Sequence, residues 1–452
     1  MLFERIESAG LAQHSYLIGD QQTAVVIDPR RDGEVYVELS AQAGMRIEAV
    51  LETHRHEDFI VGSVPLAAHT NAEIWHADAQ LPYQYGQAVT PGQIWHVGRL
   101  TLEALHTPGH TEGSMSYLLR EPSGAPWAVF TGDALFAGEV GRVDFLGMAR
   151  APELAGMLYD AIFEKLLPLG DGVLICPAHG AGSACGSAIG DRTWTTVGLE
   201  RALNTRLQLP SREAFIEAVA RQLPKPPYFE RVERINLTGP EPSLTVPPQP
   251  LLAAKAFAAA DAEAFVLDTR PELAFSAQHI AGAQFVGVDR LSMLGGWFLP
   301  IDEPLLIVAE DADAPGVVRQ LARLGYDCIS GLLAGAMTAW HTAGYPSVSL
   351  PEIGVRNVVR SLEAGDALWL LDVRSAQEFT AGHVAGAHNI PLQQLTGRRD
   401  EVPGNKQVVA ICGTGARAMI GASALQRHGW PNMSVMLGGL TAWSSAGLPL
   451  AQ

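Results

Sequence analysis

The feature that most constrains this fold is a group of histidine and aspartate clusters, each placed directly after an apolar run. The first cluster is THRHEDF at residues 53–59, which follows the apolar run at residues 47–51. That run predicts a buried strand. Two imidazoles and a carboxylate at positions i, i+2 and i+4 can converge on one cation only where the backbone turns, and loops at strand ends turn. The cluster therefore predicts a metal site at the end of a strand.

The first half of the chain supplies three more clusters of this kind. They are HTPGHT at residues 106–111, FTGD at residues 130–133 and PAHG at residues 177–180. Each again follows an apolar run. Four separated loops that all carry metal-ligand side chains favour one shared metal centre over a set of structural histidines.

The four clusters resemble those of the metallo-β-lactamase superfamily, whose His-x-His-x-Asp-His loop and later His, Asp and His converge at one end of a two-sheet sandwich. The resemblance implies an α/β fold with an N-terminal αββα sandwich. Two-metal members carry a histidine directly after the aspartate, where this chain has Phe59. The second metal would lose a nitrogen ligand, so a one-metal site is expected.

One branch of the superfamily, the persulfide dioxygenases, holds a single non-haem Fe(II) on two histidines and one aspartate. The other face of that iron is open to substrate and O2. Similarity to this branch implies one Fe(II) per chain, with zinc as the alternative metal. The implied ligands are His54, His110 and Asp133. The groups that would orient these ligands, or mark a vestigial second metal site, are His56, Asp58 and His179.

Two further segments are candidates for contact with substrate. GRVDF at residues 141–145 also resembles the persulfide dioxygenases, in which the arginine lies near the thiol carrier. We expect Arg142, with Asp144 beside it, to bind substrate or order the site, because its planar guanidinium group suits bidentate contact with a carboxylate. A structural ion pair between the two residues is the alternative. Cys185 follows His179 in a glycine-rich stretch, where it either takes part in the chemistry or is an inert buried thiol.

The second half of the chain contains an internal repeat. LDTR and HIAGA within residues 267–283 match LDVR and HVAGA within residues 371–387 at the same spacing, and both copies end on Ala-Trp followed by Gly-x-Pro. These marks resemble the rhodanese fold, a small doubly wound parallel sheet. With a proline-rich linker near residue 240, we expect a metallo-β-lactamase-like domain at 1–240 and two tandem rhodanese-type parallel α/β domains at 241–350 and 351–452.

The second repeat carries a cysteine loop, which the first repeat lacks. Residues 412–417, CGTGAR, follow the apolar strand 408–411 and resemble the rhodanese active-site loop. The resemblance implies that Cys412 is the nucleophile and that Arg417 adds positive charge. The implied cradle for the sulfur consists of Gly413, Thr414, Gly415 and Ala416. Tyrosine phosphatases separate the cysteine and arginine by five residues, so the four found here favour sulfur over phosphate.

The first repeat has AEDAD at residues 309–313 where that loop should lie. Three carboxylates would repel an anionic persulfide, so this domain is predicted to be inactive and to space, dock or assemble the others. Its cysteine, Cys328, is expected on a strand in the core.

Composition excludes several function classes. The formal charge of −17 disfavours nucleic acid and anionic membranes as partners. Residues 1–7 do not suggest a signal peptide, and no apolar stretch is long enough to span a membrane. Four cysteines far apart in the sequence fit a reducing cytoplasm. The superfamily resemblance also implies a homo-oligomer, either a dimer or a tetramer.

Together these features predict a sulfide-detoxifying fusion enzyme. A thiol persulfide and O2 would give sulfite in the first domain, and Cys412 would combine sulfite with persulfide sulfur to give thiosulfate. Glutathione, coenzyme A and cysteine stay open as the carrier thiol. The alternatives are a zinc-dependent thioester hydrolase of the glyoxalase II type fused to a sulfurtransferase, and a non-enzymatic sulfur-carrier scaffold.

Overall fold

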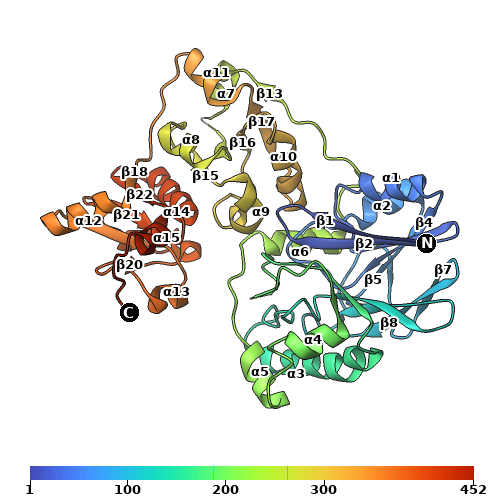
Figure 1. The fold of residues 1–452 in the computed structure, drawn as a ribbon. Helices are drawn as coiled ribbons and strands as arrows, with labels where there is room; N and C mark the ends of the chain where they lie inside the picture. Colours follow the sequence, from blue (N-terminus) through green and yellow to red (C-terminus); the bar gives the residue numbers. More distant parts are fainter. Residues whose placement is uncertain (187, 262) are drawn as a thin grey trace. The chain divides into compact units, whose positions relative to one another are not determined.

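The computed structural model describes residues 1–186, 188–261 and 263–452. The chain forms two compact units, drawn in Figure 1. One unit comprises Met1–Pro247 with Arg319–Gly325, and the other comprises Pro248–Val318 with Tyr326–Gln452. Among the described residues, no helix has both the length and the apolar character that crossing a bilayer requires.

Two six-stranded sheets form the first unit. In the first sheet, β1 to β3 pair antiparallel and β3 to β6 pair parallel. Its strands are, in order, β1 (Leu2–Ser8), β2 (Gln13–Asp20), β3 (Thr23–Ile27), β4 (Arg46–Glu52), β5 (Glu73–His76) and β6 (Gln87–Ala88). The second sheet contains, in order, β12 (Thr195–Thr196), β11 (Leu174–Pro177), β10 (Pro126–Gly132), β9 (Met115–Arg120), β8 (Leu100–His106) and β7 (Ile94–Val97).

The alternation of side chains along the strands explains why the two sheets pack face to face. Ile18, Val25 and Leu51 of the first sheet share one buried core with Tyr117 and Phe130 of the second. Neighbouring residues on a strand point to opposite faces of the sheet. The next side chains along these strands therefore point outward, where an apolar residue needs a second covering layer.

Helices supply that outer layer. Val26 and Val50 pack with Tyr36 of α1 and Leu66 of α2, and on the second sheet Val129 packs in the cluster that includes helix α3. The helices of this unit are α1 (Glu34–Gln42), α2 (Ser63–Thr70), α3 (Ala151–Ala161), α4 (Val197–Leu203), α5 (Arg212–Val219) and α6 (Phe229–Thr238). Residues Ile162–Leu166 continue α3 as a π-helix, and Leu167–Leu169 form a 3-10 turn. The expected αββα sandwich is confirmed.

The second unit contains two five-stranded, all-parallel sheets with the same strand order. The first is β13 (Leu251–Leu252), β17 (Ile329–Leu333), β16 (Leu305–Val308), β14 (Phe265–Asp268) and β15 (Gln284–Phe285). The second is β18 (Glu352–Gly354), β22 (Met433–Leu437), β21 (Gln407–Ile411), β19 (Leu368–Asp372) and β20 (His388–Asn389). The internal repeat therefore corresponds to two copies of one parallel α/β fold, as predicted.

Helices connect the parallel strands in both copies. Those of the first are α7 (Ala254–Asp261), α8 (Glu272–Ala277), α9 (Leu291–Leu294), α10 (Ala314–Arg323) and α11 (Ala336–Thr342). Those of the second are α12 (Val355–Ala364), α13 (Ala376–Ala381), α14 (Ala416–Arg427) and α15 (Gly439–Ser445). Short 3-10 turns at Val288–Arg290, Gly295–Trp297, Leu392–Gln394 and Arg399–Glu401 complete the connections.

The repeated Leu-Asp-x-Arg motif is a buried ion pair at the end of a strand. Nη2 of Arg270 lies 2.6 Å from Oδ2 of Asp268, and Nη2 of Arg374 lies 2.7 Å from Oδ2 of Asp372. In each copy the same Nη2 also donates, at 2.8 Å, to the backbone oxygen eight residues after the arginine. The motif therefore ties each strand to the end of the helix that follows, which explains why both copies carry it.

Candidate functional site

Three buried side chains from three loops of the first unit bring unpartnered atoms together. His54 follows β4, His110 follows β8 and Asp133 follows β10. Nε2 of His54 and Nε2 of His110 lie 3.7 and 3.5 Å from Oδ2 of Asp133, and the three atoms all lie within 4.8 Å of one another. Within the described part of the chain, none of the three has a hydrogen-bond partner. Buried polar atoms are normally partnered, so this group is a candidate metal centre.

The second nitrogen of each imidazole is held by a hydrogen bond that fixes the ring. Nδ1 of His54 lies 2.9 Å from Oγ1 of Thr53, whose own hydroxyl donates to Asp28 at 2.7 Å. Because that hydroxyl proton is already used, Nδ1–H of His54 is the donor to Thr53. Nδ1 of His110 donates to the backbone oxygen of Arg142 at 2.9 Å. In its neutral form each ring therefore presents an unprotonated Nε2, which is the form that binds a metal.

Asp133 presents one oxygen to the centre because His179 holds the other. Nδ1 of His179 lies 2.8 Å from Oδ1 of Asp133. Burial acts to raise the pKa of Asp133, but His179, His54 and His110 together hold that pKa well below its usual range. Burial lowers the pKa of His54 well below its ordinary value. The centre therefore combines an ionised carboxylate with a neutral imidazole at His54.

This donor set fits a divalent transition metal. Two imidazole nitrogens and one carboxylate oxygen form the facial set of non-haem Fe(II) oxygenases, and Zn(II) accepts the same donor types. One cation would satisfy all three unpartnered atoms at once. The structure thus brings together the three residues that the sequence assigned as ligands, and their metal remains a prediction.

His56 and Phe59 lie beside this centre without adding a ligand atom to it. Among the described residues, neither belongs to a group of converging metal ligands. Nε2 of His56 lies 3.0 Å from Oδ1 of Asp28; burial acts to lower the pKa of His56, but the Asp28 carboxylate raises it above its ordinary value. Phe59 is buried with its ring 4.6 Å from the His56 ring. An apolar ring therefore occupies the position after Asp58.

Asp58, His179 and Cys185 form a second group of buried ligand atoms within 4.8 Å of one another. Nε2 of His179 lies 2.9 Å from Oδ2 of Asp58. His179 therefore connects the two groups, since its Nδ1 holds Asp133. Burial, and then the Asp58 carboxylate, raise the pKa of the Cys185 thiol well above its ordinary value. Cys185 thus lies near the metal centre as a protonated thiol rather than a preformed thiolate.

Arg142 is held entirely by protein groups. Its Nε and Nη2 donate to the two carboxylate oxygens of Asp144 at 2.7 and 2.8 Å. The remaining donors reach the backbone oxygens of Ala184, Leu223 and Pro224 at 3.2, 2.9 and 3.0 Å. All the N–H donors of the guanidinium are therefore engaged. Arg142 and Asp144 form the ion pair considered from the sequence, and the backbone oxygen of the same arginine orients His110.

The cysteine loop of the second unit lies between β21 and α14. Cys412 is 1% exposed, and the backbone N–H of Gly415 lies 3.1 Å from its Sγ. The loop is anchored from the next helix, because the N–H groups of Leu440 and Thr441 donate to the oxygens of Cys412 and Gly413 at 2.9 Å. Thr414 and Ala416 complete the turn, and α14 begins at Ala416, directly after the Gly415 N–H that faces the sulfur.

Arg417 interacts with Cys412 and is also paired to a carboxylate. Its Nη1 and Nη2 donate to the two oxygens of Glu378 at 2.9 and 2.7 Å. Glu378 also closes a capping box with Ser375 at the start of α13. A second carboxylate comes from the first repeat, since Oε1 of Glu272 lies 2.9 Å from where a Cβ on Gly415 would be. The sequence showed neither acidic neighbour.

The corresponding strand of the first repeat, β16, ends at Val308 and leads into Glu310 and Asp311, which are exposed. No cysteine stands at this turn, in keeping with the prediction of an inactive repeat. The expectation that Cys328 lies on a strand in the core is wrong. Cys328 is exposed and precedes β17, which begins at Ile329.

Comparison with known proteins gives family matches for the first and the last domain. The metallo-beta-lactamase superfamily matches residues 9–179, and the rhodanese-like domain matches residues 355–446. Mitochondrial persulfide dioxygenase ETHE1 of Bos taurus is 34% identical over 238 residues, which cover 50% of this chain and 83% of that protein. The chain belongs to the ETHE1 persulfide dioxygenase family. This member of the family carries two rhodanese-type sheets after its metallo-beta-lactamase sandwich.

Two other similarities bear on this persulfide dioxygenase family member. The crystal structure of a metallo-beta-lactamase from Staphylococcus aureus is 28% identical, with a TM-score of 0.66, and the match covers 74% of this chain and 98% of that chain. The hydroxyacylglutathione hydrolase GloC of Haemophilus influenzae is 29% identical over 233 residues, covering 47% of this chain and all of that protein.

Helix α6 holds the histidine loop of this family member, and the sequence analysis missed it. Nδ2 of Asn236 donates to the backbone oxygens of His56 and Phe59, both at 2.9 Å, and its Oδ1 accepts from the N–H of Val61 at 3.1 Å. The hydroxyl of Tyr228 donates to the oxygen of Asp58 at 3.0 Å. A buried asparagine in line with apolar residues of the helix was the available signal.

A cavity of about 350 Å³ opens beside the candidate metal centre of this persulfide dioxygenase relative. His110 lines it, and the Phe145 ring lies edge-on to the His110 ring at 5.2 Å. Much of the remaining wall is apolar and includes Leu81, Met115 and Leu146. The cavity therefore gives a small molecule a largely apolar path to one ligand of the centre.

Proposed function

We propose that this chain is a persulfide dioxygenase with a fused sulfurtransferase. The supporting observation is the set of converging, unpartnered atoms on His54, His110 and Asp133, with the apolar Phe59 next to Asp58. In the proposed reaction a thiol persulfide, O2 and water give the thiol and sulfurous acid, which ionises to sulfite. The terminal sulfur is oxidised, the S–S bond breaks and O2 is reduced.

Iron(II), one per chain, is the proposed metal because a facial set of two histidines and one aspartate leaves coordination positions for O2 and a sulfur ligand. Thr53 and the backbone oxygen of Arg142 hold the two imidazole rings, and His179 holds Asp133. The apolar cavity beside His110 would take the carrier thiol and exclude bulk water. Glutathione, coenzyme A and cysteine are candidate carriers.

The proposed second reaction takes place at Cys412. Its thiolate attacks the outer sulfur of a persulfide, the carrier thiolate leaves, and Cys412 then holds one extra sulfur. Sulfite attacks that sulfur, thiosulfate leaves and the Cys412 thiolate returns. The Gly415 N–H, 3.1 Å from Sγ, would stabilise the anionic sulfur. Fusion raises the effective concentration of sulfite near Cys412. In this proposal the domains are 1–240, 241–350 and 351–452.

Oxygen uptake tests the first reaction. We expect the iron-loaded protein to consume O2 with glutathione persulfide and to form sulfite and thiosulfate. Cys412→Ser should leave O2 uptake unchanged and abolish thiosulfate. No uptake with the persulfides of glutathione, coenzyme A and cysteine would reject the dioxygenase, and thiosulfate made by Cys412→Ser would reject the role of Cys412.

A second candidate, metal-dependent thioester hydrolysis, is favoured by one observation. Asp58, His179 and Cys185 form a further group of ligand atoms beside the first, as a two-metal hydrolase requires. Two zinc ions per purified chain, with hydrolysis of S-lactoylglutathione, would support that function. One iron per chain without hydrolysis would reject it.

A further inference from the structure

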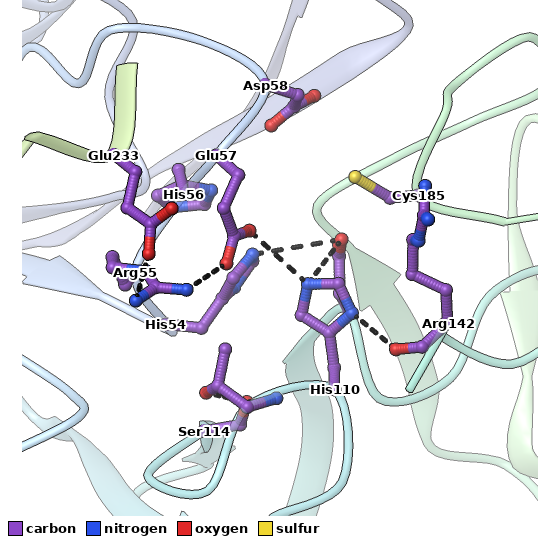
Figure 2. Close-up of polar contacts among 12 residues, drawn as sticks. His54, Arg55, His56, Glu57, Asp58, His110, Ser114, Arg142, Cys185 and Glu233 are labelled. Carbon is purple, nitrogen blue, oxygen red and sulfur yellow. Dashed lines mark hydrogen bonds and ion pairs between the residues drawn. The ribbon is translucent and has the colours of Figure 1, made fainter. Parts of the chain in front are cut away.

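Glu57 is a buried carboxylate with one oxygen fixed and the other free. Its Oε1 accepts from Nη2 of Arg55 at 2.7 Å. Its Oε2 has no hydrogen-bond partner among the described residues and lies 3.8 Å from Nε2 of His110. Figure 2 shows Glu57 pointing toward His110, with Arg55 on its other side.

Arg55 is itself held in place, so the direction of the Glu57 carboxylate is fixed. Nη1 of Arg55 lies 2.5 Å from Oε1 of Glu233 on α6, and its backbone N–H donates to Asp78 at 2.8 Å. Arg55 is buried, and Glu233 is partly exposed. The bridge from Glu233 through Arg55 thus aims the free oxygen of Glu57 at the candidate metal centre.

A purely structural ion pair between Arg55 and Glu57 does not account for this arrangement. The pair uses Oε1 and leaves Oε2 buried without a donor, which is destabilising. Oε2 also faces Nε2 of His110, another unpartnered buried atom. Two unpartnered acceptors side by side indicate that a cation, or a hydrogen-bond donor bound to one, belongs between them.

Glu57 is not part of the group whose ligand atoms all lie within 4.8 Å of one another. It therefore faces the centre from outside the three expected ligands. From there its free oxygen can accept a hydrogen bond from a water molecule on the cation, and its charge attracts the cation directly.

We propose that Glu57 is a positioning residue of the metal centre. Its Oε2 accepts a hydrogen bond from a water on the cation, and its charge strengthens the binding of a divalent metal. The inference rests on the metal site of the proposed function and adds to it a second carboxylate, which is not one of the three expected ligands. With Glu57 ionised beside Arg55 and the cation, the position nearest Glu57 would favour water over the persulfide anion.

The test compares Glu57→Gln with Glu233→Gln. Both changes remove a carboxylate partner of Arg55, but only the first removes an oxygen that faces the centre. We expect Glu57→Gln to weaken Zn(II) and anaerobic Fe(II) binding about 10-fold or more, as measured by competition with a chelator. Glu233→Gln should bind within about 2-fold of wild type, because its amide oxygen can still accept from Arg55 and the backbone N–H of Arg55 stays bonded to Asp78. The Co(II) absorption spectrum should change only in Glu57→Gln, and Glu57→Asp should keep part of the affinity.

Thermal unfolding of the metal-free proteins checks that each variant folds, and Glu57→Asp carries the comparison if Glu57→Gln does not fold. Wild-type affinity and an unchanged Co(II) spectrum in Glu57→Gln would overturn the inference, as would equal losses in Glu57→Gln and Glu233→Gln. If the wild-type protein bound no divalent metal, the proposed function itself would fail. That result is distinct from a wild-type protein that binds metal without help from Glu57.

Discussion

Arg417 and Glu378 form a two-point ion pair beside the sulfur-transfer loop, with nitrogen–oxygen distances of 2.9 and 2.7 Å. Glu378 comes from α13, so the charge that the sequence assigned to the loop is balanced from another element. Arg417 also interacts with Cys412, so the paired guanidinium and the Gly415 N–H both act on the sulfur. The ion pair with Glu378 therefore moderates the positive charge near the loop and fixes its position.

The ion pair should make stability depend on acid pH. Arg417 lowers the pKa of Glu378 from 4.5 to about 2. Because the pKa of Glu378 is lower in the folded than in the unfolded protein, the ion pair adds its full contribution to the free energy of unfolding above about pH 4.5. That contribution is lost as the pH falls through about 2. Glu378 is 40% exposed, so solvent limits the effect to about 1 kcal/mol or less. At pH 6 the melting temperature of wild type should exceed that of Glu378→Gln, and at pH 2 the two melting temperatures should be alike. The exposed Glu363→Gln is the control.

Gly415→Ala should inactivate sulfur transfer. Gly415 has φ of +119°, which strains any other residue by about 1–3 kcal/mol. An added Cβ would also lie 2.9 Å from Oε1 of Glu272. We expect thiosulfate formation to fall about 10-fold or more while O2 uptake is unchanged. Gly429→Ala, at φ of +100° with open space around it, controls for strain away from the loop. Wild-type sulfur transfer in Gly415→Ala would contradict the role of this cradle.

Thr53→Val should weaken the metal centre without changing any expected ligand. The substitution keeps the shape of the side chain but removes the oxygen that holds Nδ1 of His54. Loss of such a partner typically costs about 10–100-fold in metal affinity. Chelator competition measures the change. Thr342→Val, at an exposed position of α11 in the second unit, is the matched control and should bind metal like wild type.

Asn236→Leu should destabilise the protein and loosen the histidine loop. The substitution leaves two backbone oxygens and one N–H without their partner, at about 1–3 kcal/mol for each group that stays buried. We expect a fall in melting temperature of about 6 °C or more, together with weaker metal binding. Thr238→Ala, on the exposed face of the same helix, should show neither effect. Normal metal binding in Asn236→Leu would show that α6 does not support the site.

Much of this architecture follows from local sequence. The apolar runs before His54, His110 and Asp133 predicted strands whose ends carry these residues, and the strands form with the ligand atoms converging. The repeated motifs at equal spacing, with their resemblance to the rhodanese fold, predicted two copies of one parallel fold, and in both copies the Asp-x-Arg motif forms a buried ion pair at a strand end.

Contacts between distant segments could not be predicted in this way. Asn236 lies 180 residues after His56. The sequence of the helix around Asn236 does not indicate that its side chain bonds to the histidine loop. Glu378 lies 39 residues from Arg417, so the sequence did not indicate this ion pair. Cys328 was expected in the core because apolar residues follow it, but the strand starts one residue later and leaves it exposed.

Helix α6 also determines how short a fragment of the metallo-β-lactamase-like domain can be made by truncation. The superfamily match ends at residue 179, yet the helix that grips the loop of His56 runs to Thr238. A fragment that ends after His179 would keep every expected ligand. It would lose Asn236 of α6, which holds the histidine loop in place. A fragment meant to keep the candidate metal centre should therefore include α6, and a shorter fragment that fails to bind metal says nothing about the intact chain.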